Sequence, residues 1–92
     1  MGKIATYKFF TLFVVSFDLF KEPAHLHIIK EKGNYNNPAK IWLDTLVFAE
    51  VGDLTQVEQN AVRDLVGKNL NLFKESFEAL KRGEKVKSIK LD

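Results

Sequence analysis

The sequence predicts an α+β fold, in which strands occupy the first half of the chain and one long helix occupies most of the second. Residues 7–50 are rich in aromatic and β-branched side chains broken by Gly, Asn and Pro, a composition typical of strands and turns. Residues 55–82 repeat apolar side chains at spacings of three to five, as an amphipathic helix does. We therefore expect a small antiparallel sheet of three to five strands packed on one long C-terminal helix.

The size and composition of the chain fit one domain. With 92 residues, of which 46% are hydrophobic, residues 1–92 suffice for a single core. Eight Phe side chains supply large apolar areas to that core. Because the chain has no Cys, stability rests on packing, and an oxidising compartment is not indicated.

An apolar run from Phe9 to Phe20 resembles the core of a signal peptide in composition. However, Thr11, Ser16 and Asp18 interrupt it, and no small-x-small cleavage site precedes the Lys-Glu-Pro that follows. The run is also too short to span a bilayer as a helix. We therefore expect a strand of a cytoplasmic protein, with no membrane partner.

The net charge of +2 is too small to imply a nucleic-acid partner by itself. The charge is uneven, however, since residues 81–92 hold five basic side chains against Glu84 and Asp92. Such a short run is most often a solvated tail. Because of this local excess of basic side chains, nucleic acid stays one of the alternative partners.

Four strands are expected within the first half of the chain. Residues 7–17 are apolar on both alternating faces, so their β-branched and aromatic content, rather than periodicity, favours a strand covered on both sides. Residues 18–24 are expected to form a connection, because Pro23 prevents continuous strand pairing there. The later strands are expected over 25–30, 39–44 and 46–50.

The helix over 55–82 has recognisable signals at both ends. Thr55 and Glu58 fit a capping box, in which each side chain accepts a hydrogen bond from the backbone N–H of the other residue. Gly67 costs about 1 kcal/mol relative to Ala and marks a point of possible bending. Gly83 fits a left-handed cap that ends the helix. Residues 86–91 could add a short final strand. The expected apolar stripe comprises Val57, Ala61, Val62, Leu65, Val66, Leu70, Phe73, Phe77 and Leu80.

The only two histidines form a His-x-His run at His25 and His27. Residues two apart in a strand point to the same face, so both imidazoles should share one face. If the second and third strands bury their aliphatic side chains together, that face also collects Lys40, Trp42 and Asp44.

This arrangement requires a particular antiparallel register, and a slip of one residue would move every side chain to the opposite face. The loop between the two strands, with its Gly, Asn and Pro residues, allows such pairing. The expected pairs are Leu26 with Leu43, Ile28 with Ile41, His27 with Trp42 and His25 with Asp44.

Three interpretations of this face stay open. As a metal site, His25, His27 and Asp44 offer three nitrogen and oxygen ligands, the number found in catalytic zinc sites. As a catalytic site, the two imidazoles could transfer protons near neutral pH in phosphodiester cleavage, and Lys40 could stabilise charge. As packing, one imidazole would stack on Trp42 and the other would bond to Asp44.

Partner binding would use the same face. Trp42 and Lys40 would contribute its apolar and basic contacts, and Tyr35 would add an aromatic side chain from the Asn-rich loop. This interpretation needs no cofactor, whereas the hydrolase interpretation would take a divalent metal such as zinc.

Two motifs resemble a known family. The Pro-Ala-His-Leu-His run at 23–27 and the Ala-Lys-Ile-Trp-Leu-Asp run at 39–44, followed by a capped helix, resemble the small prokaryotic family of unknown function numbered 4160. The resemblance covers nearly the whole chain. Ala24 departs from it, because the family usually has a second proline there. The motif positions carried over are Pro23, His25, His27, Lys40, Trp42 and Asp44.

The resemblance implies an interaction role. Members of that family have no established activity, and their genes often lie beside a small DNA-binding partner, in an arrangement similar to toxin–antitoxin operons. We therefore expect a non-enzymatic domain that binds a protein encoded nearby. The alternatives are a nuclease-like or metal-dependent hydrolase using His25, His27 and Asp44, and a nucleic-acid-binding domain using Trp42 and residues 81–90.

Overall fold

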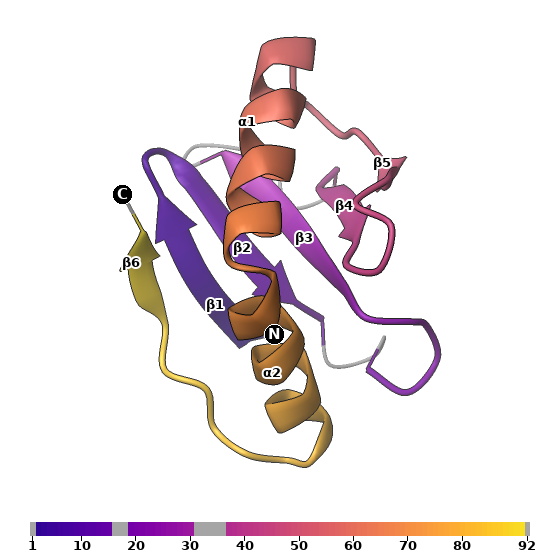
Figure 1. Cartoon of the computed structure of the whole chain (residues 1–92), viewed down its shortest axis with the longest axis vertical. Helices are drawn as coiled ribbons and strands as arrows, with labels where there is room; N and C mark the ends of the chain where they lie inside the picture. Colours follow the sequence, from indigo (N-terminus) through magenta and orange to yellow (C-terminus); the bar gives the residue numbers. More distant parts are fainter. Residues whose placement is uncertain (1, 16–18, 31–36, 92) are drawn as a thin grey trace.

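The computed structural model describes residues 2–15, 19–30 and 37–91, which form a six-stranded sheet with two helices across one of its faces (Figure 1). The α+β class is confirmed, although the sheet is larger than expected. Its strand order is β5-β4-β3-β2-β1-β6. The strands are β1 (Gly2–Tyr7), β2 (Phe10–Val14), β3 (His25–Lys30), β4 (Ala39–Trp42), β5 (Phe48–Glu50) and β6 (Ile89–Leu91), and the helices are α1 (Gln56–Lys68) and α2 (Leu70–Lys81).

The expected single strand over 7–17 is wrong, because a hairpin of β1 and β2 takes its place. The turn lies at Lys8 and Phe9, where Lys8 adopts a left-handed φ of 52°. Turns of this kind usually carry Gly or Asn, and residues 8–9 contain neither, so no local signal predicts this turn. Residues 16–17 of the expected strand lie outside the described residues.

The sheet is mixed rather than purely antiparallel. The short strand β6 pairs in parallel with β1, and Lys90 lies opposite Thr6. The final strand expected over 86–91 is therefore present at 89–91, on the edge beyond β1. This pairing places the first and the last strand of the described chain side by side (Figure 1).

The single long helix is also wrong, because the chain leaves helical geometry at Asn69. Its backbone N–H is shared between the carbonyls of Leu65 and Val66, at 3.2 Å each, and its side-chain amide donates to Leu65 at 3.0 Å. Asn side chains compete with the helical hydrogen bonds in this way. The break falls two residues after Gly67, near the expected bend.

Both expected helix ends are confirmed. The Thr55 hydroxyl accepts from the Glu58 N–H at 3.2 Å, and the Glu58 carboxylate accepts from the Thr55 N–H at 2.8 Å. At the other end, Gly83 has a φ of 80°, and the N–H of Glu84 donates to the Ala79 carbonyl at 3.0 Å. This is the Schellman arrangement that ends helices at a glycine.

The main core lies between the helices and one face of the sheet. The cross-strand row of Ala5, Leu12, Ile28 and Ala39 is buried there. Among the described residues, no helix is long and apolar enough to cross a membrane. The expected helical stripe is confirmed as buried at Val62, Leu65, Val66, Phe73 and Phe77 and as partly buried at Leu70 and Leu80, whereas Val57 and Ala61 are exposed.

Gly52 ends β5 at a close approach of two backbones. Its φ is 55°, and a Cβ atom there would lie 2.7 Å from both the Ala39 nitrogen and the Asn37 carbonyl oxygen. Only glycine fits such a position without displacing the neighbouring segment. The connection from β5 to α1 is thereby held against the start of β4.

Candidate functional site

The register of β3 and β4 differs from the expected one by two residues. His25 lies opposite Trp42, and His27 lies opposite Lys40. Because side chains alternate with a period of two, this shift preserves the faces, and the predicted shared face of these four residues is confirmed. The shift moves Asp44 beyond the end of β4. The connection over residues 31–38 is too long to fix a register by turn geometry, which explains the error.

His25 lies at the centre of an aromatic cluster. Its side chain is fully buried, and its Nδ1–H donates to the Pro23 carbonyl oxygen at 2.8 Å. The ring centroid lies 5.1 Å from that of His27, 5.7 Å from that of Trp42 and 5.6 Å from that of Phe77 on α2. At this end of β3, the His25 ring therefore contacts helix α2 through Phe77.

His27 is buried in the same cluster. Its ring stacks on Phe13 with a centroid distance of 5.4 Å and an interplanar angle of 23°. The cross-strand row on this face runs from Lys3 through Phe13, His27 and Lys40 to Glu50. In this row, His27 packs between Phe13 of β2 and Lys40 of β4, and Lys3 of β1 lies beyond Phe13.

Lys40 and Trp42 form the partly exposed end of this face. The Lys40 ammonium pairs with Glu22, and its nitrogen lies 4.7 Å from the Trp42 ring centroid. An ammonium over an indole ring gains a cation–π attraction. The Trp42 ring is thus held in place by Lys40 on one side and by His25 at an angle of 78°. Tyr35 lies outside the described residues.

Asp44 lies in the turn after β4 and is exposed. Its carboxylate pairs with Lys74 of α2 at 3.3 Å. The hydrogen bond between Asp44 and a histidine, which the packing interpretation expects, is therefore wrong, because the register places Trp42 and not Asp44 opposite His25. Within the described ranges, no group of three or more His, Asp or Glu side chains is arranged to hold a metal ion.

The chemistry available on this face is limited by burial. An imidazole that transfers protons to a substrate must reach it, and His25 has no exposed surface. The face instead supplies a rigid aromatic support under Trp42. The structure brings His25, His27 and Lys40 together, but both histidines are buried. The partly exposed side chains here are Trp42 and Lys40, whose charge is neutralised by Glu22.

A second constellation lies at the opposite edge of the sheet. A hollow of about 290 Å³ is lined by residues of β1, β2 and the turn between them, namely Lys3, Thr6, Lys8, Phe9, Phe10 and Thr11. Lys90 of β6 pairs with Thr6 beside it. Sequence reasoning missed this group, because the hairpin and the parallel pairing that assemble it leave no local signal.

Comparison of the chain with protein-family models, with curated proteins and with solved structures found no match. The resemblance to family 4160 therefore stays a prediction that rests on the two motifs.

Proposed function

We propose that this chain is a non-enzymatic domain that binds a protein partner at the β4–β5 edge of its sheet. The observation that carries the proposal is an apolar surface at that edge. Val47 and Val51, on either side of β5, are 56% and 45% exposed. Trp42 lies on the neighbouring strand and is partly exposed.

The backbone of this edge is suited to a further strand. β5 is the last strand of the described sheet on this side and is three residues long. Extended segments of partner proteins bind such edges by adding a strand, and the pockets beside them select side chains. Phe48 fixes the strand by packing its ring against the core, with the Arg63 guanidinium 5.5 Å from its centroid.

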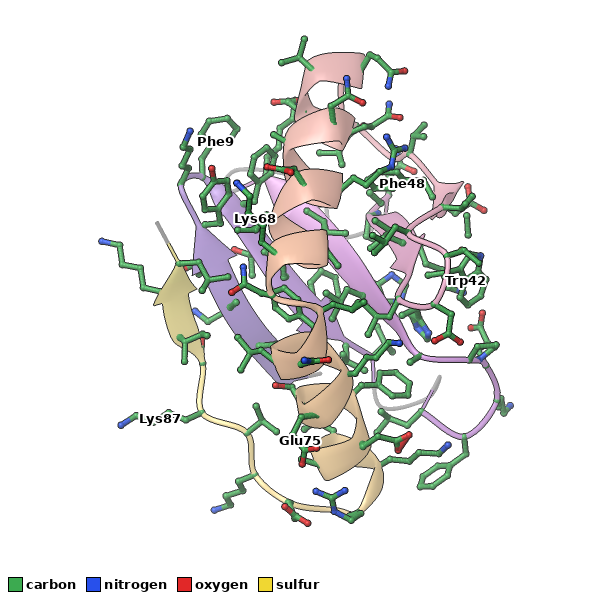
Figure 2. The ribbon with its side chains drawn as sticks, in the orientation of Figure 1. Phe9, Trp42, Phe48, Lys68, Glu75 and Lys87 are labelled. Carbon is green, nitrogen blue, oxygen red and sulfur yellow. The ribbon has the colours of Figure 1, made fainter. Side chains whose placement is uncertain are left out.

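Trp42 would serve as the anchor of the interface. Its backbone N–H donates to the Val47 carbonyl at 3.0 Å, which brings the two residues together where the β4–β5 hairpin begins. Figure 2 shows Trp42 and Phe48 on the same side of the molecule. Aromatic side chains that are already ordered lose little conformational entropy on binding, and Trp is enriched among binding hot spots.

We further propose that the partner is encoded nearby, in a two-gene module similar to a toxin–antitoxin operon. This part of the proposal rests on the resemblance of the two motifs to family 4160. The buried state of His25 favours this interaction role over the hydrolase alternative.

Co-expression with the product of the neighbouring gene, followed by size-exclusion chromatography, tests the proposal. We expect co-elution, and we expect Val47→Asp to weaken binding by about ten-fold or more, because it places a charge in the apolar surface. Val57→Asp is the matched control, since Val57 is 78% exposed and belongs to the first turn of α1 rather than to the sheet. Separate elution at micromolar concentration, or equal weakening by both substitutions, would contradict the proposal.

A further inference from the structure

Most basic side chains in the described part of the chain fall into two groups. One group is neutralised by carboxylates and comprises Lys30, Lys40, Lys68, Lys74 and Arg82. In the second group, no ion pair forms with any described residue. Apart from Arg63 and Lys81 on the helices, that group comprises Lys3, Lys8, Lys85, Lys87 and Lys90, all exposed and all in β1, in the β1–β2 turn or in the segment that ends in β6. Although the net charge is only +2, the edge of the sheet formed by β1 and β6 is therefore basic.

Strand pairing gives this edge a defined arrangement. Lys90, Thr6 and Thr11 form one cross-strand row, since Thr6 pairs with Lys90 on one side and with Thr11 on the other. Lys3 lies on β1 three residues before Thr6, and it lines the same hollow as both threonines. Ammonium groups and hydroxyls are the side-chain groups that most often contact phosphate oxygens.

An exposed aromatic ring stands beside these polar groups. Phe9, in the β1–β2 turn, is 46% exposed, and its ring lies 4.6 Å from that of Phe10, which is buried. The buried ring supports the exposed one in place. Figure 2 shows Phe9 and Lys87 on the side of the molecule that carries β6, opposite Trp42 and Phe48. This combination of a supported aromatic ring and unpaired lysines is typical of surfaces that bind single strands.

We infer that the edge formed by β2, β1 and β6 binds single-stranded nucleic acid. Phosphates would contact Lys3, Lys8 and Lys90, and an unpaired base would stack on Phe9. A single strand is favoured over a duplex, because a base within a duplex has no free face to offer the ring. The inference is independent of the proposed partner edge, which lies at the other end of the strand order.

An anionic membrane is the competing occupant of a basic surface. Binding to a membrane surface depends on buried apolar area in addition to charge. Here the hollow offers a single half-exposed ring among lysines and threonines, whereas a base needs only one ring. The observations therefore favour nucleic acid.

Fluorescence anisotropy of a short labelled oligouridylate tests the inference on the full-length chain. We expect binding that weakens as salt rises from about 50 mM to about 200 mM, with a slope of log K against log salt of about −2 for three phosphate contacts. Replacing Lys3, Lys8 and Lys90 together by Gln should abolish most of that slope. Phe9→Ala should weaken binding about ten-fold with little change in the slope.

The matched control replaces Lys68, Lys74 and Lys81 together by Gln, which removes the same charge from the helices. It should retain the affinity and the slope. Circular dichroism melting checks that each variant folds. Absence of binding at low salt, equal loss in both triple variants, or selective binding of anionic phosphatidylserine vesicles in place of the oligonucleotide would overturn the inference.

Discussion

The two edges of the sheet differ in composition and in how firmly the chain holds them. At the β5 edge, Val47 and Val51 are exposed and Trp42 is partly exposed, and the connection after β5 is fitted against β4 at Gly52. At the β6 edge, a strand that is three residues long, as β5 is, carries Lys90, and its apolar residues Ile89 and Leu91 are partly buried. Charged side chains on an edge strand discourage pairing with another strand, whereas an apolar edge invites it.

On the basis of this difference, we propose that the two edges contact different classes of molecule. The aromatic cluster around His25 lies between them and connects β3 and β4 to α2 through Phe77. The His-x-His run, which is the most conspicuous motif in the sequence, therefore packs within the sheet, and the two surfaces that we propose for binding lie on either side of it.

The largest expected effect compares isoleucines near the two edges. Ile41 of β4 is fully buried, so Ile41→Ala should lower the free energy of unfolding by about 4 kcal/mol. Ile89→Ala in β6 should cost only about 1 kcal/mol, because a partly buried side chain loses less contact area. Urea unfolding of both variants measures the difference. Equal losses would show that β6 is as firmly held as β4.

Two glycines, one on the connection after β5 and one on the connection from α2 to β6, give a smaller contrast. Gly52→Ala should cost about 3 kcal/mol, since it combines an unfavourable positive φ with contacts of 2.7 Å to backbone atoms. Gly83→Ala should cost about 1 kcal/mol, because nothing lies within 4 Å of its Cβ position and only the φ of 80° opposes it. Thermal unfolding checks both. A milder effect at Gly52 than at Gly83 would contradict the close approach.

The smallest expected effect is a dependence on pH. The hydrogen bond from Lys30, supported by the Thr55 N–H, lowers the pKa of Glu58 from its ordinary value of 4.5. A lowered pKa contributes stability above the ordinary value, and that contribution is lost as the pH falls through the value in the folded state. Stability should therefore fall on acidification.

The pKa of Glu84, on the connection to β6, is lowered by Arg82 two residues away. Such a local pair can also form in the unfolded chain, whereas the pair of Glu58 with Lys30 joins α1 to β3. Glu58→Gln should therefore remove more of the acid sensitivity than Glu84→Gln. Urea unfolding at neutral pH and at about pH 3 measures this difference. A larger effect of Glu84→Gln would be the contrary result.

The sequence was informative wherever local chemistry decides the structure. The capping box at Thr55, the helix end at Gly83 and the shared face of His25 and His27 are all confirmed. Each depends on residues that are close together in the chain. The α+β class follows from the same local patterns.

Pairing between distant segments could not be predicted in the same way. The β1–β2 turn carries Lys8 at a left-handed φ without the usual Gly or Asn, so the sequence predicts one strand where the hairpin forms. The register of β3 with β4 follows a long connection rather than a tight turn. The basic edge exists only because β6 pairs in parallel with β1, which brings Lys90 beside Thr6.

Chemical-shift mapping of the ¹⁵N-labelled chain with the oligouridylate tests the division of the sheet most directly. We expect the amide signals of Lys3, Thr6, Phe9 and Lys90 to shift in a salt-dependent manner, while the Trp42 indole and Val47 amide signals stay in place. Shifts centred on Trp42 and Val47, with an unperturbed hairpin turn, would contradict the assignment of different partners to the two edges.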